Sequence, residues 1–156
     1  MNYSLCQTKV QEIIDIIHEA DDSKEFLPSK ADADFSVYKF FIESDQNIGI
    51  YLFALKDDHG LSLGFISLIP DKVALHAHIG PMYIRRQYRG LSLGKIQVQE
   101  IIEWCKNIGV KKLSSKTWGS NLRSRKIFEE LGFTIYDERL GQRINGDSTV
   151  KYSIDI

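Results

Sequence analysis

The sequence predicts a single α/β domain built around a mixed β-sheet. Strand-like segments rich in β-branched and aromatic residues alternate with helical patterns in the second half of the chain. The chain has 156 residues, a size at which one hydrophobic core is usual. Its hydrophobic share of 43% and charged share of 26% are those of an ordinary globular protein. No internal repeat or linker divides the sequence, so we expect one domain over residues 1–156.

Charge and cysteine content argue against several classes of protein. Lys and Arg total 20, Asp and Glu total 21, and the formal net charge is −1. Proteins that bind nucleic acid through its phosphates carry a basic excess, so we expect no nucleic-acid partner. Cys6 and Cys105 lack the close spacing of a metal site or redox pair, which predicts reduced thiols, no metal and a cytoplasmic location. No stretch reaches the ~18–20 apolar residues that span a bilayer, so we expect no membrane partner.

Two helices are expected in the first third of the chain. Apolar residues recur with helical spacing at Val10, Ile13, Ile14 and Ile17, which predicts a helix over 8–20. Val37, Phe40 and Phe41 predict a short second helix. The segment between them, 21–34, is acidic and polar.

Three strands follow. The segments 48–55 and 61–69 are rich in strand-forming residues, and the turn former Asp57-Asp58-His59-Gly60 between them predicts a hairpin. Pro70-Asp71-Lys72 is expected to turn the chain into a third strand over 73–84. This strand contains Gly80-Pro81, and because a proline cannot donate a ladder hydrogen bond, we expect a bulge or a local splay there.

Helix and strand patterns alternate through the rest of the sequence. A long helix is predicted after Gly94 and closes at Asn107 and Gly109. The remaining expected elements are a strand over 110–117, a helix over 121–131 that ends at Gly132, and strands over 133–139 and 148–156. The expected order is therefore α-α-β-β-β-α-β-α-β-β.

A basic, glycine-containing loop joins the third strand to the long helix. It reads Arg85-Arg86-Gln87-Tyr88-Arg89-Gly90-Leu91-Ser92-Leu93-Gly94-Lys95. Backbone N–H groups at a helix start bind anions, and a glycine lets a phosphate approach the main chain, so a diphosphate is the expected ligand. The alternative is a purely structural loop in which Gly90 serves a turn, Ser92 caps the helix and the arginines are solvated.

A second stretch, later in the chain, supports a functional interpretation of the loop. It reads Asn121-Leu122-Arg123-Ser124-Arg125-Lys126-Ile127-Phe128-Glu129-Glu130-Leu131-Gly132-Phe133. Together the two stretches resemble the GNAT family of acyl-CoA-dependent N-acyltransferases. The family loop reads Arg/Gln-x-x-Gly-x-Gly/Ala, here Arg89-x-x-Ser92-x-Gly94, and the later helix matches at Asn121, Ser124, Gly132 and Phe133. The resemblance implies a mixed sheet of about six to seven strands, flanked by about four helices and splayed between the fourth and fifth strands.

The resemblance also implies an activity and a set of cofactor contacts. Acetyl-CoA would be the co-substrate and a primary amine of a small molecule or peptide the acceptor, with direct attack on the thioester. Main-chain groups of Met82, Tyr83 and Ile84 would pair with the pantetheine arm. The loop with Arg89 would hold the pyrophosphate through the amides of Gly90, Leu91, Ser92, Leu93, Gly94 and Lys95, and Asn121 would contact the cofactor or help form its tunnel.

Two residues depart from the family pattern. Ser92 replaces the middle glycine of the loop, and we expect it to adopt a negative φ and to use its hydroxyl as a helix cap or phosphate ligand. Phe128 lies at the cofactor-contacting position where many members have a tyrosine thought to protonate the departing thiolate. Since a thiol with a pKa near ~8.5 can leave as its anion, the loss of that hydroxyl does not by itself abolish transfer.

His76 and His78 are the candidate catalytic bases. They are two residues apart on a predicted strand and therefore share a face, and a neutral imidazole can accept a proton from an ammonium or begin a water chain. His78 also occupies the position at which some arylalkylamine-acetylating members carry a histidine. The alternative is that both are structural and that the amine loses its proton to water.

The acceptor itself is not evident from the sequence. Acidic residues in the first third either attract a cationic acceptor or are merely exposed: Asp21, Asp22, Glu25, Asp32 and Asp34. The segments 21–41 and 141–147 would decide the acceptor. Two rivals to the enzyme are a CoA-binding module without catalysis and a nucleic-acid-binding domain that uses Arg85, Arg86 and Arg89. The late strands often pair subunits in the family, which makes a homodimer one option.

Overall fold

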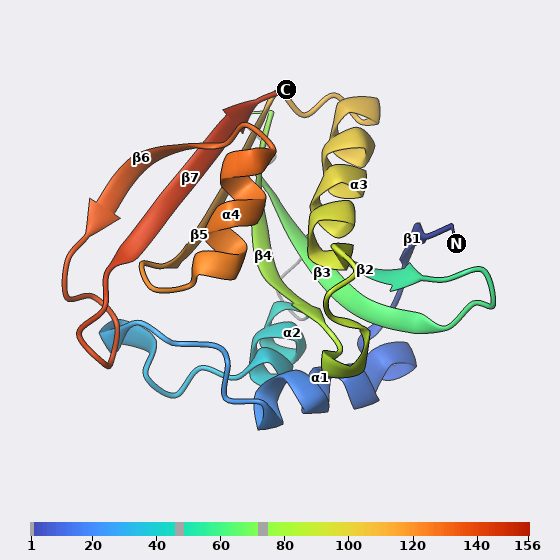
Figure 1. Cartoon of the computed structure of the whole chain (residues 1–156), viewed down its shortest axis with the longest axis horizontal. Coiled ribbons are helices and arrows are strands. Elements are labelled where there is room, and N and C mark those ends of the chain that lie inside the picture. The colour runs from blue at the N-terminus through green and yellow to red at the C-terminus, as the bar shows by residue number, and fades with distance from the viewer. Residues whose placement is uncertain (1, 46–48, 72–74) are drawn as a thin grey trace.

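The structure, a computed structural model, describes residues 2–45, 49–71 and 75–156 (Figure 1). Within these ranges a short strand precedes two helices, and three strands then lead into alternating helices and strands. The strands are β1 (Ser4–Gln7), β2 (Tyr51–Lys56), β3 (Ser62–Asp71), β4 (His76–Ile84), β5 (Lys112–Trp118), β6 (Thr134–Arg139) and β7 (Thr149–Asp155). The α-helices are α1 (Ile14–Asp22), α2 (Val37–Asp45), α3 (Leu93–Asn107) and α4 (Leu122–Glu130).

The seven strands form one mixed sheet in the order β1-β2-β3-β4-β5-β7-β6. Adjacent strands in the sheet are antiparallel except β4 and β5, which are parallel and are connected through α3. A parallel pair needs such a crossover because the chain must return to the same end of the sheet. Figure 1 shows α3 and α4 in front of the sheet and α1 and α2 at its lower end. The prediction of a mixed α/β sheet with about four helices is confirmed.

Alternation along the strands separates two cores. Phe53, Ala77 and Ile79 pack in the core that contains the buried residues of α3 and α4. Leu52 and Phe65 point to the other face, where they pack with the buried residues of α1 and α2. Since successive strand residues point to opposite faces, His76 and His78 lie on the face away from α3 and α4.

The N-terminal region differs from its prediction. β1, which was not expected, pairs with β2 from Ser4↔Lys56 to Gln7↔Phe53. Four residues are too few to show a strand period, so pairing with β2 rather than local preference makes this segment a strand. The first helix also begins later than expected, because Val10–Ile13 form a 3-10 turn before α1.

The other boundaries lie close to those predicted. Pro70 and Asp71 belong to β3 rather than to a turn. Two of the expected strand starts, at residues 48 and 73, lie outside the described residues. No helix in the described part of the chain is both long enough and apolar enough to cross a bilayer.

The expected bulge and splay at Gly80-Pro81 are confirmed. The β3–β4 register shifts there, so that Gly80 and Pro81 together face Ser67, whose hydroxyl donates to the Pro81 carbonyl at 2.8 Å. On its other side β4 pairs with β5 only through His76, Ala77 and His78. A bulged strand bends, so β4 leaves β5 beyond His78. Figure 1 shows these two strands diverging.

A methyl group at position 80 tests how tightly the bulge is built. A Cβ on Gly80 would lie 2.6 Å from the Ser67 hydroxyl oxygen. We expect Gly80→Ala to lower the free energy of unfolding, measured in urea, by about 1–2 kcal/mol. Combining it with Ser67→Ala removes the clashing oxygen, so the double variant is expected to be more stable than the sum of the two single costs predicts. Additive costs would contradict this account of the bulge.

Candidate functional site

The separation of β4 from β5 leaves one edge of β4 without a neighbouring strand. Met82, Tyr83 and Ile84 pair with β3 on one side only. On the open side, the Arg89 Nε donates a hydrogen bond to the Ile84 carbonyl at 3.0 Å. An extended chain such as a pantetheine arm can therefore pair with this edge as a strand would.

The loop after β4 presents a run of backbone donors. None of the N–H groups of residues 90–95 donates to a residue in the described ranges, and the 15-residue helix α3 begins at Leu93. Gly90 has a φ of +87°, and no atom lies within 4 Å of the position that a Cβ would occupy there. Successive free amides at the start of a long helix suit a diphosphate, so these residues fit coenzyme A.

The conformation expected for Ser92 is wrong. Ser92 has a φ of +59°, in the left-handed region, and its hydroxyl makes no capping hydrogen bond to α3. The loop therefore keeps the backbone shape that a glycine would adopt. A left-handed conformation costs a residue with a Cβ about 1–2 kcal/mol, so serine is strained at this position.

The basic side chains around the loop have carboxylate partners. Arg85 lies 3.2 Å from Glu19 and 3.1 Å from Asp15, and Lys95 lies 3.1 Å from Glu130. The expectation that the arginines are merely solvated is wrong for Arg85, whose side chain is 22% exposed.

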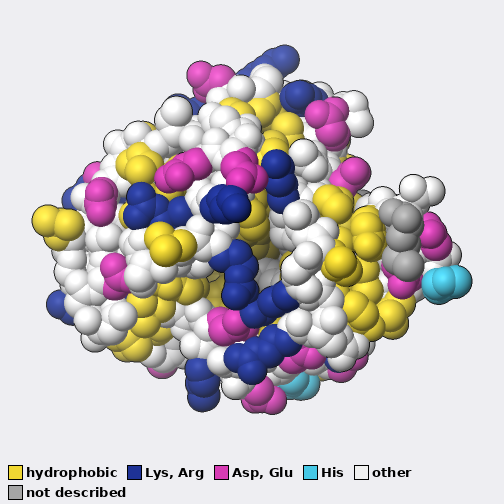
Figure 2. Space-filling view, viewed as in Figure 1, with side chains coloured by type: hydrophobic (Ala, Val, Ile, Leu, Met, Phe, Trp, Pro, Cys, Tyr) yellow, Lys and Arg dark blue, Asp and Glu magenta, His cyan; other side chains and the backbone are white. Residues whose placement is uncertain are grey.

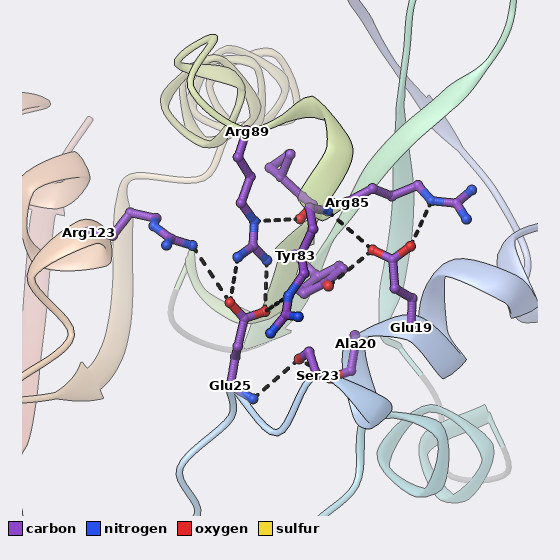
Figure 3. Close-up of polar contacts among 10 residues, drawn as sticks. Glu19, Ala20, Ser23, Glu25, Tyr83, Arg85, Arg89 and Arg123 are labelled. Carbon is purple, nitrogen blue, oxygen red and sulfur yellow. Dashed lines mark hydrogen bonds and ion pairs between the residues drawn. The ribbon is translucent and has the colours of Figure 1, made fainter.

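Arg89 is held most closely, by Glu25. Its two terminal nitrogens bind the two Glu25 oxygens, and its guanidinium lies 5.0 Å from the Tyr83 ring centre (Figure 3). Arg86 and Arg123 lie 4.0 and 3.9 Å from the same carboxylate. The hydrogen bond from Arg89 holds the pKa of Glu25 below its ordinary value. One carboxylate thus occupies the guanidiniums that a phosphate at this loop would use.

Other acidic residues of the first third also have structural partners. Asp21 accepts hydrogen bonds from the Val37 and Tyr38 N–H groups at 2.6 and 3.0 Å and thereby holds the start of α2. Asp34 forms an ion pair with Lys39 at 2.8 Å. These partners reduce the negative charge that this region offers to a cationic acceptor.

Ser114 joins the two histidines. Its hydroxyl oxygen lies 3.0 Å from the His76 Nε2 and 2.9 Å from the His78 Nδ1. A hydroxyl has one proton to donate and can accept others, so at most one ring nitrogen accepts from Ser114 and at least one donates to it. His78 and Ser114 are register partners on β4 and β5, directly before these strands separate. The sequence did not single out Ser114, although a polar run in a central strand, Ser114-Ser115-Lys116-Thr117, is unusual.

Burial lowers the pKa of His78 to about 4, and the positive charges of Lys116, His76 and Lys151 add to this effect. The imidazole is therefore neutral at pH 7 and can accept a hydrogen bond from an amine. A base with so low a pKa takes a proton from an ammonium poorly, because the most effective general bases have a pKa near the working pH. Burial is the largest cause of the low pKa, and the neighbouring cations add to it, so a compensating negative charge nearby would help His78 to hold a proton.

Asn121 and Phe128 are both built into α4. Asn121 caps the helix, accepting from the Ser124 N–H at 3.4 Å, and its amide donates to Thr117 at 2.8 Å. Phe128 is 1% exposed and packs against Phe133 and Tyr152. The Tyr152 hydroxyl donates to Glu129 at 2.9 Å and accepts from Arg125 at 3.0 Å, so it is already engaged.

The structure brings together the two segments expected to decide the acceptor. Ser29 pairs with Arg143, the Lys30 N–H donates to the Gln142 carbonyl at 2.7 Å, and the Ile144 N–H donates to the Pro28 carbonyl at 3.1 Å.

Figure 2 shows a hollow in the middle of the molecule bordered by Lys and Arg side chains. Among the described residues, no three His, Cys, Asp or Glu side chains converge as metal ligands would.

Comparison with known proteins places this geometry among acetyltransferases. The family model described as the Acetyltransferase (GNAT) family matches residues 11–133. An uncharacterized N-acetyltransferase of Schizosaccharomyces pombe is 31% identical over 76 residues, which are 49% of this chain and 47% of that protein. The chain spans less than half the length of the curated relatives that it matches: the matched regions cover 9% of one relative and 47% of the other.

Solved structures share the fold at low sequence identity. The ribosomal-protein-S18-alanine N-acetyltransferase from Escherichia coli has a TM-score of 0.78 and 16% identity, covering 99% of this chain and 94% of that chain. A mutant of the spermidine N-acetyltransferase from Vibrio cholerae has a TM-score of 0.78 and 13% identity, covering 98% of this chain and 93% of that chain.

Glu25 is expected to compete with the phosphates of coenzyme A. In Glu25→Gln the carboxylate charge is gone, so Arg89, Arg86 and Arg123 become available to the cofactor. We expect isothermal titration to show that coenzyme A binds about three- to tenfold more tightly to this variant. Asp34→Asn, which removes an exposed carboxylate paired with Lys39, is the control and should bind like the wild type. Weaker binding by Glu25→Gln would mean that the ion pair supports the loop instead.

The low pKa of His78 predicts how stability depends on pH. A histidine in the unfolded chain takes up a proton near pH 6.5, whereas folded His78 does so only near pH 4. The unfolded state therefore binds more protons between these values, and this contribution to stability is lost as the pH falls. From pH 7 to pH 4.5 the wild type should lose about 2–3 kcal/mol more unfolding free energy in urea than His78→Gln. The control His59→Gln should keep the full loss, and parallel losses in wild type and His78→Gln would refute the assignment.

Proposed function

The chain belongs to the GNAT family of acetyltransferases, and from this we propose that it transfers an acetyl group from acetyl-CoA to a primary amine of a small molecule or peptide. We further propose that residues 1–156 act as one catalytic domain. The observation that carries the proposal is the open edge of β4 followed by the free amides of residues 90–95. A pantetheine arm and a diphosphate, in that order, are what these two features suit.

Each part of the site has a role in this proposal. When bound, acetyl-CoA supplies the acetyl thioester. Met82, Tyr83 and Ile84 align the pantetheine arm, and a backbone N–H among them stabilises negative charge that develops on the thioester oxygen. The loop from Gly90 to Lys95 binds the pyrophosphate, and Asn121 fixes the start of α4 beside it.

The acceptor reaches the thioester from the face that carries His76 and His78. The nitrogen attacks the carbonyl carbon, the carbon–sulfur bond breaks, and the thiolate leaves with the electron pair of that bond. The nitrogen loses a proton, which His78 or a water held by it accepts. His76 and Ser114 orient the His78 ring through the shared hydroxyl. Because Phe128 has no hydroxyl, solvent supplies the proton that the thiolate finally takes up.

Thiol release by the purified protein tests this function. With acetyl-CoA and a panel of primary amines, the wild type should release coenzyme A, detected with a thiol reagent. We expect His78→Gln to lower kcat/KM at least tenfold and to change its pH dependence, since a general base contributes about 10²–10⁴-fold. The control His59→Gln lies in the β2–β3 turn and should behave as the wild type. Unchanged pH–rate profiles in His78→Gln and His76→Gln would remove both from the mechanism.

The burial of Phe128 favours a second candidate, a CoA-binding module without catalysis. The phenyl ring is part of the core, and the nearest tyrosine hydroxyl in that core, on Tyr152, is engaged by Arg125 and Glu129. This candidate predicts that isothermal titration shows acetyl-CoA binding while no amine in the panel causes thiol release. Absence of binding at high micromolar acetyl-CoA would refute both candidates.

A further inference from the structure

Positive charge is concentrated on the sheet face beside His78. Lys116 on β5 is the direct register partner of Lys151 on β7, and both lie on the His78 face. Like charges opposite one another on neighbouring strands repel and destabilise a sheet. Asp137 lies 3.6 Å from Lys151 but is closer to Arg139, at 2.8 Å. The Lys116 side chain makes no hydrogen bond or ion pair with any residue in the described ranges.

A third cation, Arg143, approaches from the β6–β7 connection. It is 8% exposed, and its hydrogen bonds go to neutral oxygens, the Thr149 hydroxyl at 2.9 Å and the Leu27 carbonyl at 2.7 Å. Its guanidinium lies 5.9 Å from the centre of the Trp118 ring. No ion pair to Arg143 is formed within the described ranges, and a buried cation without a paired carboxylate is costly.

Two of the cations act on the third, Lys116. Lys116 is exposed to solvent, but partial desolvation lowers its pKa, and the charges of Arg143 and Lys151 lower it further, against a smaller opposing effect of Asp32. Burial likewise lowers the pKa of Arg143, opposed by Asp147, whose carboxylate is hydrogen-bonded to Ser120. An anion beside Lys116 and Arg143 would thus gain from positive charge that no carboxylate of the described residues neutralises by an ion pair.

We propose that Lys116, Lys151 and Arg143, with Trp118 at their side, bind a carboxylate or phosphate group of the acceptor, so that the acceptor is an amine that also carries negative charge. This basic cluster deepens the proposed function and rests on it, because it names the class of amine that would be acetylated. A cationic polyamine fits the cluster poorly. Of the five acidic residues that could have attracted one, Asp21, Glu25 and Asp34 have partners within the protein.

The basic cluster also links acceptor binding to the pKa of His78. Lys116 and Lys151 contribute to the low pKa of the imidazole, beside the larger effect of burial. An anion bound between these lysines offsets their charge and moves the pKa of His78 back toward neutrality. His78 then accepts a proton more readily when the acceptor is in place than when the site is empty.

Binding of inorganic phosphate tests the cluster without any turnover. The chain has two tryptophans, and their indole N–H signals can be followed by NMR. Saturating coenzyme A is added first, so that phosphate does not occupy the cofactor loop. Phosphate at millimolar concentration should shift the Trp118 signal. Trp104, which packs against Tyr51 and Phe53 at ring distances of 5.1 and 5.0 Å, should not respond.

Two lysine variants give the comparison. Lys116→Met keeps the apolar stem and removes the charge. We expect the dissociation constant for phosphate, measured from the Trp118 signal, to be at least about tenfold higher in this variant. Lys106→Met, on the surface of α3 with Glu103 as its partner at 3.3 Å, should respond like the wild type. An unresponsive Trp118 in the wild type, or an equal response in Lys116→Met, would overturn the proposal.

Kinetics with matched amines then separates this proposal from the proposed function. The panel pairs each neutral amine with a carboxylated and a phosphorylated counterpart, such as an amino sugar and its phosphate. We expect a KM about tenfold lower for a charged member, and Lys116→Met should abolish the difference without a matching fall in kcat. Turnover without a charge preference would overturn the basic cluster alone. Absence of turnover with every amine would overturn the proposed function, and the phosphate titration would still decide the cluster.

Discussion

The bulge at Gly80-Pro81 is the constraint on which the rest of the site depends. Two residues of β4 face one residue of β3, so β4 bends and cannot follow β5 beyond His78. This divergence opens the edge of β4, directs the following loop toward the start of α3, and leaves His78 and Ser114 at the last paired position. If β4 and β5 stayed paired beyond His78, the N–H and carbonyl groups of β4 that the proposed cofactor needs would form hydrogen bonds with β5 instead.

The site has two basic regions that differ in how their cations are paired, although the net charge of the chain is only −1. At the cofactor loop, Arg85, Arg89 and Lys95 are paired with carboxylates from α1, its following segment and α4. At the β5–β7 face, Lys116 and Arg143 have no carboxylate partner among the described residues. The cations of the first region are therefore neutralised by carboxylates of the protein, whereas these two cations of the second region are not.

Local patterns predicted the parts of the site that single segments encode. The loop with its glycines, the helix that starts at Asn121 and the histidine pair could be read from the sequence because each depends on spacings of a few residues, whereas the capping role of Asn121 was not predicted. Ser114 and its role as the link between His76 and His78 could not, since the interacting residues are 36 and 38 positions apart. The backbone of Ser92 was mispredicted for a related reason: the loop between β4 and α3 fixes a left-handed turn that serine alone disfavours.

By itself, the sequence determined the order of helices and strands from the first helix onward, the mixed sheet and the position of the bulge, because hydrophobic periods and a proline act locally. Only the tertiary structure decided that residues 4–7 form a strand, that Glu25 binds Arg89, and that segments 28–30 and 142–144 meet. These contacts join residues far apart in the chain, and their energies depend on which charged and polar groups packing brings together. No short pattern records that information.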